Sequence, residues 1–157
     1  MVRYLKQRDG YSCGPVAVLN AMKWAGFEVT GENLKVFRWI ALCTSPHGCW
    51  PRHLHNLIKL QFERKASAMK GKPTMKYMDK WLDQGNSIIM RYFWHDKERN
   101  KRVGHYIFIP DRTEKYYKVC NDGRNRPALT MISRKTMNNY LRMQRKGDTC
   151  CTWFIRK

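Results

Sequence analysis

The stretch that decides the fold is QRDGYSCGPVAVLNAMKWAG, residues 7–26. It places Cys13 and the pair Gly14-Pro15 directly before an almost wholly apolar run that ends at Gly26. Proline suits the first turn of a helix, where its missing N–H would have no partner in any case. A helix that is apolar on most sides is one that other elements cover. We therefore predict a buried helix that begins beside Cys13.

Cys13 is the first candidate for chemistry. At the amino end of a buried helix, unpaired N–H groups and the positive end of the helix dipole favour a thiolate. The thiolate is the reactive form, so this is a suitable position for a nucleophile. The alternative is that Cys13 is a small core residue chosen for packing, as most cysteines are.

Three further residues fit a nucleophilic cysteine. Gln7 lies six residues before Cys13, and its side-chain amide can donate to an oxyanion beside the attacking sulfur. His105, in the apolar segment VGHYIFI, can act as the base. Asp122, in VCNDG, can orient the imidazole. The predicted site is therefore Cys13, His105, Asp122 and Gln7.

This order of Gln, Cys-Gly-Pro, Gly-His-Tyr and Asn-Asp resembles the papain-like cysteine peptidases. More closely, it is similar to the bacteriocin-processing (double-glycine) peptidases and their stand-alone relatives. The resemblance runs from about Tyr4 to about Tyr140, with lesser matches at residues 30–35, 48–57 and 85–90. Gly123 follows Asp122 where relatives often have proline, so Asn121 remains an alternative third member.

The resemblance implies a cysteine peptidase that cleaves a peptide or isopeptide bond through a Cys-His-Asp triad. Relatives cut after Gly-Gly in leader peptides, usually as the front domain of a transporter. A free-standing member is implied here, acting on a peptide or protein with a glycine-containing site. Acyl transfer to an amine would use the same four residues and stays open. No cofactor or metal is expected for this chemistry.

Length and composition indicate a globular protein. A chain of 157 residues is expected to form one domain, 1–157, that buries a real core without disulfides. No apolar run is long enough to cross a bilayer, and the first ten residues lack a secretory signal, so no membrane partner is expected. Because the Gln7 motif begins almost at once, no inhibitory propeptide is expected either. The six cysteines are therefore expected to be reduced thiols in the cytoplasm.

The net charge of +19 is the other large feature. Such a surface attracts polyanions, and the basic residues are spread along the whole chain. It would suit an acidic peptide or protein substrate. Specific binding of nucleic acid is a weaker expectation, because an excess of basic residues does not by itself recognise a base sequence. The competing hypothesis is a basic binding module on an inactive peptidase-like fold, in which Cys13 is incidental.

A second cluster of ligand-type residues lies within thirteen residues of sequence. Its members are Cys43, His47, Cys49, His53 and His55. Thiolate and imidazole suit zinc, but these spacings are not those of a common finger or ribbon. The alternative is a loop followed by a helix from Pro51, whose inward positions are Leu54, Leu57, Ile58 and Phe62.

The remaining pattern is helical first and β-rich later, which defines an α+β class. Further helices are predicted at residues 31–42, 75–84 and 133–144, with Thr30, Thr74 and Ser133 as caps. Strands are predicted at residues 60–68, 87–94, 103–110, 116–121 and 150–156, and three of them form an antiparallel meander. The expected architecture is an N-terminal helical half packed on a C-terminal antiparallel sheet. Cys13 then faces His105 and Asp122 across a groove between the halves.

Overall fold

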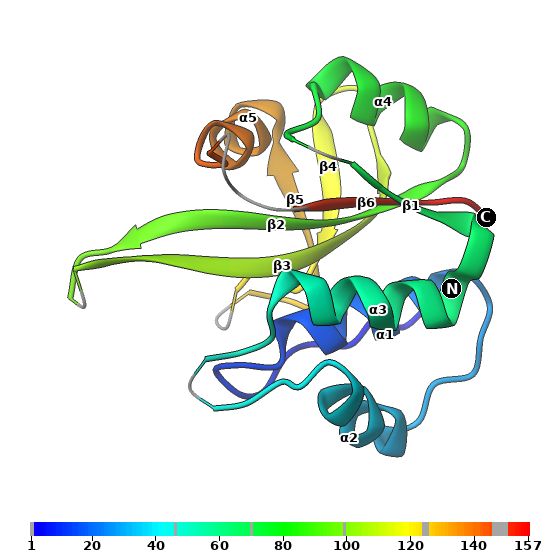
Figure 1. Cartoon of the computed structure of the whole chain (residues 1–157). Helices are drawn as coiled ribbons and strands as arrows, with labels where there is room; N and C mark the ends of the chain where they lie inside the picture. The colour runs from blue at the N-terminus through cyan, green and yellow to red at the C-terminus, as the bar shows by residue number, and fades with distance from the viewer. Residues whose placement is uncertain (1, 46, 70, 99, 124–125, 146–150) are drawn as a thin grey trace.

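The computed structural model describes residues 2–45, 47–69, 71–98, 100–123, 126–145 and 151–157. Its centre is a six-stranded antiparallel sheet in the order β1-β6-β2-β3-β4-β5 (Figure 1). The strands are β1 Ala66–Met69, β2 Ser87–Asp96, β3 Lys101–Arg112, β4 Tyr116–Cys120, β5 Leu129–Ser133 and β6 Thr152–Ile155. The helices are α1 Cys13–Trp24, α2 Gly31–Ile40, α3 Pro51–Phe62, α4 Met75–Asp83 and α5 Arg134–Arg142, with a short 3-10 turn, η1, at Glu63–Lys65.

Helices cover both faces of this sheet. In Figure 1, α1, α2 and α3 lie below it, and α4 and α5 lie above. Strand residues accordingly divide between two cores, with Ile89 facing α1 and α3 and its neighbour Ile88 facing α4. The α+β class and the antiparallel sheet are as predicted. The two helices on the far face, α4 and α5, follow β1 in the chain.

The buried helix after Cys13 is also as predicted. Every residue of α1 from Cys13 to Met22 is buried. Asn20 is polar but satisfied, because its Oδ1 accepts from the Leu5 N–H at 2.7 Å and its Nδ2 donates to the Leu5 carbonyl at 3.0 Å. This pair of bonds ties the N-terminal segment along α1, and so brings Gln7 towards the start of the helix.

Most predicted helix starts are found with their caps. The Thr74 hydroxyl accepts from the Tyr77 N–H at 3.2 Å, and the Ser133 hydroxyl accepts from the Thr136 N–H at 3.1 Å. The strand predicted at residues 60–68 was wrong in its first half. Helix α3 continues to Phe62, which is buried on the same face as Leu54 and Ile58, and the strand begins only at Ala66.

Two other differences concern strands. Strand β5 was not predicted, because it is an edge strand in which only Ile132 is buried and the apolar alternation is weak. The hairpin loop predicted at residues 95–102 is shorter, since β2 and β3 pair as far as Asp96 and Lys101. The closing strand begins at Thr152, and residue 150 of its predicted range lies outside the described residues.

The site is positioned by a difference in strand length. Strand β3 is long and pairs with β2 from Lys101 to Ile109, whereas β4 pairs with β3 only between Phe108 and Arg112. Residues of β3 before Phe108 therefore have a free edge on the β4 side. The amino end of α1 approaches this free edge.

Candidate active site

The structure brings Cys13 and His105 together. Cys13 is the first residue of α1 and is only 8% exposed, and His105 is a partly buried residue of β3. The thiol and the imidazole are hydrogen bonded to each other. The main-chain N–H of Tyr106, which has no β4 partner, also bonds to the Cys13 sulfur. The sulfur thus lies between the amino terminus of α1, the His105 imidazole and the main-chain N–H of Tyr106.

The electrostatics of this pair favour charge separation. Burial alone would raise the pKa of the Cys13 thiol, but the hydrogen bond and charge of His105, the Tyr106 N–H and the charge of Arg91 together lower it. Burial alone would lower the pKa of His105, but its hydrogen bond and charge interaction with Cys13 outweigh this and raise it. Both pKa shifts favour a Cys13 thiolate beside a His105 imidazolium, because each charge stabilises the other.

The far side of the imidazole meets the main chain of Asn121. Nε2 of His105 lies 2.5 Å from the Asn121 carbonyl oxygen, which leaves Nδ1 as the ring nitrogen available to the thiol. Asn121 has a positive φ of 65°, a conformation that asparagine tolerates better than most residues. Its side-chain Oδ1 accepts from the Gln7 N–H at 3.0 Å. Asn121 therefore orients the imidazole through its carbonyl and anchors Gln7 through its amide.

Asp122 lies next to this contact and acts on His105 through its charge. Its Oδ1 accepts a 2.8 Å hydrogen bond from the Tyr140 hydroxyl, and its Oδ2 lies 3.0 Å from Nη1 of Arg126. Burial raises the pKa of this carboxyl, while Tyr140, Arg126 and His105 oppose the rise. The Tyr140 ring is stacked on Tyr92 at 3.9 Å between centroids. The direct bond to the imidazole comes from the Asn121 carbonyl, so a triad role for Asp122 stays a prediction.

Gln7 is buried beside the same loop. Its Nε2 donates to the Asp9 carbonyl at 2.6 Å, and its Oε1 accepts from Nδ2 of Asn121 at 3.3 Å. In this structure the amide N–H group is therefore engaged with the chain itself. The oxyanion role of Gln7 stays a prediction.

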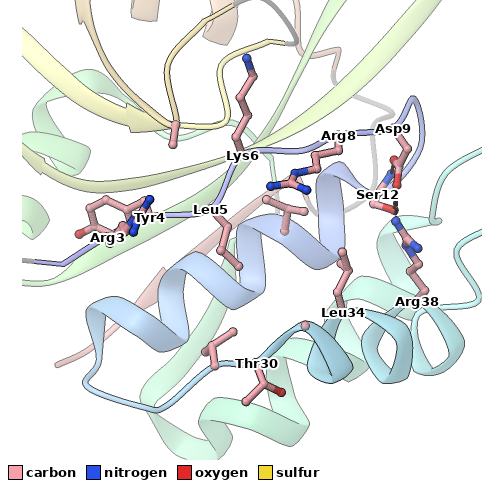
Figure 2. Close-up of a pocket in the computed structure, with 14 residues that line it drawn as sticks. Arg3, Tyr4, Leu5, Lys6, Arg8, Asp9, Ser12, Thr30, Leu34 and Arg38 are labelled. Atoms are coloured by element: carbon pink, nitrogen blue, oxygen red, sulfur yellow. Dashed lines mark hydrogen bonds and ion pairs between the residues drawn. The ribbon is translucent and has the colours of Figure 1, made fainter.

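Asp9 organises the loop before Cys13, and it was not among the residues predicted for the site. The Asp9 carboxylate accepts from the main-chain N–H groups of Tyr11 at 2.9 Å and Ser12 at 2.7 Å, and from the Ser12 hydroxyl at 2.8 Å. Figure 2 shows the Arg38 guanidinium of α2 reaching towards Asp9 and Ser12, with which it forms an ion pair and a hydrogen bond. Burial would raise the pKa of Asp9, but these hydrogen bonds and Arg38 lower it.

A cavity of about 730 Å³ lies behind this loop (Figure 2). It is bounded by the N-terminal segment, α1 and the start of α2, and its cationic lining residues are Arg3, Lys6, Arg8 and Arg38. Neither Cys13 nor His105 lines it.

The ligand-type residues between Cys43 and His55 form no metal site in the described part of the chain. Within the described residues, no group of three or more His, Cys, Asp or Glu side chains could hold a metal ion. His55 accepts a 3.1 Å hydrogen bond from Nε1 of Trp153, and Cys43 donates to the Tyr11 carbonyl at 3.0 Å. Cys49 packs against α1, where its sulfur would lie 2.4 Å from a Cβ atom added at Gly14. The alternative of a loop and a packed helix is the one found.

Arg91 also lies near the site and was not among the residues predicted for it. It is a cation inside the run SIIMRYFW of β2, and its position in an otherwise apolar strand was the available signal. Its charge acts on Cys13, Cys49 and Tyr106.

Comparison with known proteins agrees with this architecture. No family model and no curated protein sequence matches the chain. Among solved structures, a C39-like peptidase from Bacillus anthracis is similar with a TM-score of 0.71 and 13% identity, covering 99% of this chain and 94% of the other. The peptidase domain of Streptococcus ComA, a bifunctional ABC transporter involved in a quorum-sensing pathway, is similar with a TM-score of 0.67 and 13% identity, covering 99% and 97%.

The chain therefore has the papain-like fold of the C39 peptidases, which confirms the fold that the sequence motifs indicated. In the described parts of the chain, no helix combines the length and apolar character needed to span a bilayer.

Proposed function

We propose that this chain is a cysteine peptidase with Cys13 as nucleophile and His105 as general base and acid. The observation that carries the proposal is the hydrogen bond between the Cys13 thiol and the His105 imidazole at the amino end of α1. The lowered pKa of the thiol and the raised pKa of the imidazole support it. The similarity to C39-like peptidases supports the same class of reaction.

The first half of the reaction forms an acyl-enzyme. The Cys13 thiolate attacks the carbonyl carbon of the scissile bond, and the carbonyl oxygen becomes an oxyanion. When this intermediate collapses, the C–N bond breaks and His105 gives its proton to the leaving amine, which leaves the acyl group on Cys13. The Cys13 main-chain N–H, at the first position of α1, is one donor to the oxyanion. The Gln7 amide would be the second, once its N–H turns from the Asp9 carbonyl to the oxyanion. Each such donor is typically worth about 3 kcal/mol of barrier.

The second half returns the enzyme to its starting state. Neutral His105 takes a proton from water as the water oxygen attacks the acyl carbon, and collapse of the second intermediate breaks the C–S bond and releases Cys13 as a thiolate. The Asn121 carbonyl holds the ring with Nδ1 towards the sulfur. The Asp122 charge stabilises the imidazolium that forms. Attack by an amine in place of water would give acyl transfer with the same groups.

The proposed substrate is a peptide or protein segment, favoured when acidic because the chain carries a charge of +19. A glycine-containing cleavage site is the proposal that follows from the resemblance. The proposed compartment is the reducing cytoplasm. Support for it comes from four buried cysteines, Cys13, Cys43, Cys49 and Cys120, which are free thiols.

Cleavage of a proteome-derived peptide library tests the proposal. New amino termini are identified by mass spectrometry for the wild type, Cys13→Ala, His105→Ala and the control Cys120→Ala, which removes a buried thiol from β4 instead. We expect cleavage by the wild type and the control only. Equal cleavage by Cys13→Ala would refute the assignment. An added amine that appears on the new carboxyl termini would identify transfer.

The second candidate function is a basic binding module, which the net charge of +19 favours. A binding module would lose affinity for a polyanion steeply as salt rises and would bind equally well after Cys13→Ala. Such behaviour, together with no cleavage of any library peptide by the wild type, would replace the peptidase proposal.

A further inference from the structure

Arg91 lies on the face of the sheet that meets α1, at the point where the helices cease to cover it. In β2 it follows Ile89, which is fully buried under α1 and α3, and it precedes Phe93 on the same face. Arg91 itself is only partly buried. Its cross-strand partner in β3 is Tyr106, whose N–H bonds to the Cys13 sulfur. Arg91 therefore borders the candidate active site.

The guanidinium of Arg91 is held in place by its surroundings. Its Cζ lies 4.9 Å from the centroid of the Phe93 ring and 5.3 Å from that of Tyr106. A Cβ atom at Gly104 would lie only 2.4 Å from Nε and 2.8 Å from Nη2. The guanidinium thus rests directly on the bare backbone of Gly104, the residue before His105. This contact gives a steric reason for glycine at that position.

No described carboxylate is paired with this cation. Three other half-buried arginines have carboxylate partners: Arg38 has Asp9, Arg112 has Asp83 and Arg134 has Asp79. For Arg91, no hydrogen bond or ion pair joins the guanidinium to any residue that the structure describes, and its Nε is buried without a hydrogen-bond partner. A buried donor of this kind costs free energy until a ligand satisfies it.

Arg102 is the neighbouring alternative. Its Cζ lies 3.5 Å from the centroid of the same Phe93 ring. Its Nη2, however, donates to the Met143 carbonyl at 2.6 Å. Arg102 is therefore engaged with the chain, whereas the planar fork of Arg91 is bonded to no described residue and its charge acts on Cys13. That fork matches a carboxylate with two parallel hydrogen bonds.

We propose that Arg91 binds a substrate carboxylate next to the bond that Cys13 attacks. The carboxylate belongs either to an acidic side chain or to the free carboxyl terminus of the substrate. This inference rests on the proposed function, because it places the recognised group beside the Cys13 sulfur. It makes Arg91 a determinant of specificity and gives the basic character of the chain a defined role at the site.

Alkylation of Cys13 tests the proposal without requiring a known substrate. Iodoacetate carries a carboxylate and iodoacetamide is its neutral counterpart, and both react with the same thiolate. The ratio of their rates at Cys13 therefore cancels any change in the amount of thiolate. We expect Arg91→Met to lower the iodoacetate-to-iodoacetamide ratio about tenfold, because a charge-assisted pair is lost. The control Arg64→Met removes an exposed cation from η1 and should leave the ratio unchanged.

A second variant guards against a folding effect. Gly104→Ala keeps the arginine but pushes its guanidinium aside, since the added Cβ meets only the flexible end of that side chain. It should lower the ratio in the same direction as Arg91→Met. A ratio that stays at the wild-type value in both variants would overturn the proposal, as would an equal fall in Arg64→Met.

The source of the carboxylate is read from peptides that the chain cleaves. Each is compared with a version in which Glu or Asp becomes an amide, and with one whose carboxyl terminus is amidated. The substitution that raises KM in the wild type but not in Arg91→Met identifies the recognised group, and if neither does so the proposal fails. Should the wild type cleave no peptide, the proposed function fails while the alkylation ratio still decides whether Arg91 binds a carboxylate.

Discussion

Gly14 is closely packed beside the nucleophile, and replacing it tests the geometry of the site. A Cβ atom at Gly14 would lie 2.4 Å from the Cys49 sulfur, 3.1 Å from Cδ1 of Leu54 and 3.4 Å from Cδ2 of Tyr106. The first distance is too short for any real contact, so Gly14→Ala must displace either the Cys49 side chain or the first turn of α1. Since Cys49 is itself buried, the displacement has little room.

The expected magnitude follows from two opposing effects. Overpacking a close-packed core costs about 1–3 kcal/mol. Replacing glycine by alanine in a helix returns at most about 1 kcal/mol. We therefore expect Gly14→Ala to lower the free energy of unfolding by about 1–2 kcal/mol, which at this size is a fall in Tm of a few degrees. Because Cys13 is the adjacent residue, kcat/KM for any peptide substrate should fall as well.

A double-mutant cycle with Cys49→Ala isolates the contact. The second substitution removes the sulfur that the new Cβ would strike, so Gly14→Ala should cost much less in that background, with a coupling of about 1–2 kcal/mol. Gly31→Ala is the matched control, because it makes the same change at the first residue of α2, where no atom lies within 4 Å of the added Cβ. Thermal and urea unfolding measure all four variants. Strictly additive costs would refute the packing described here.

Three further outcomes are expected. Tyr140→Phe removes a hydrogen bond that lowers the pKa of Asp122, so this pKa should rise further. The acidic limb of the pH–rate profile should then move to higher pH. An unmoved limb would contradict a role for Asp122 in the reaction. Because the folded pKa of Asp9 is lowered, its contribution to stability is present above the unfolded pKa of about 3.9 and is lost as pH falls through the folded value. Asp9→Asn should thus flatten the acid side of a Tm-against-pH curve, and an unchanged curve would contradict this. Iodoacetamide at neutral pH should label Cys13 before Cys120, whose thiol pKa is raised by burial. Mass spectrometry of the labelled peptides measures the order, and labelling of Cys120 first would contradict this prediction.

Much of the fold could be predicted from local sequence patterns. The apolar run after Cys13 predicted a buried helix, and all ten residues from Cys13 to Met22 are buried. Hydroxyl caps at Thr74 and Ser133 predicted two helix starts, because a cap depends on only three or four residues. The edge strand β5 was missed because edge strands bury few side chains and so have little alternation to detect.

The site was predictable in its residue types but less so in its contacts. The sequence motifs indicated Cys13 and His105, which the fold brings into contact. The bond from His105 to the Asn121 carbonyl depends on a backbone angle, φ of 65°, that residue identity permits but does not specify. The position of Arg91 over Gly104 depends on the register between β2 and β3, which no single strand reveals.

The most direct test of the central claim is the pH dependence of Cys13 alkylation by iodoacetamide, in the wild type and in His105→Gln. In the wild type the lowered thiol pKa predicts half-maximal reactivity below about pH 8.5, the usual value for cysteine. In His105→Gln the lowering contribution of the imidazole is lost while burial remains, so the midpoint should move above the wild-type value. Identical midpoints in the two proteins would mean that His105 does not activate Cys13, and the peptidase mechanism would be wrong.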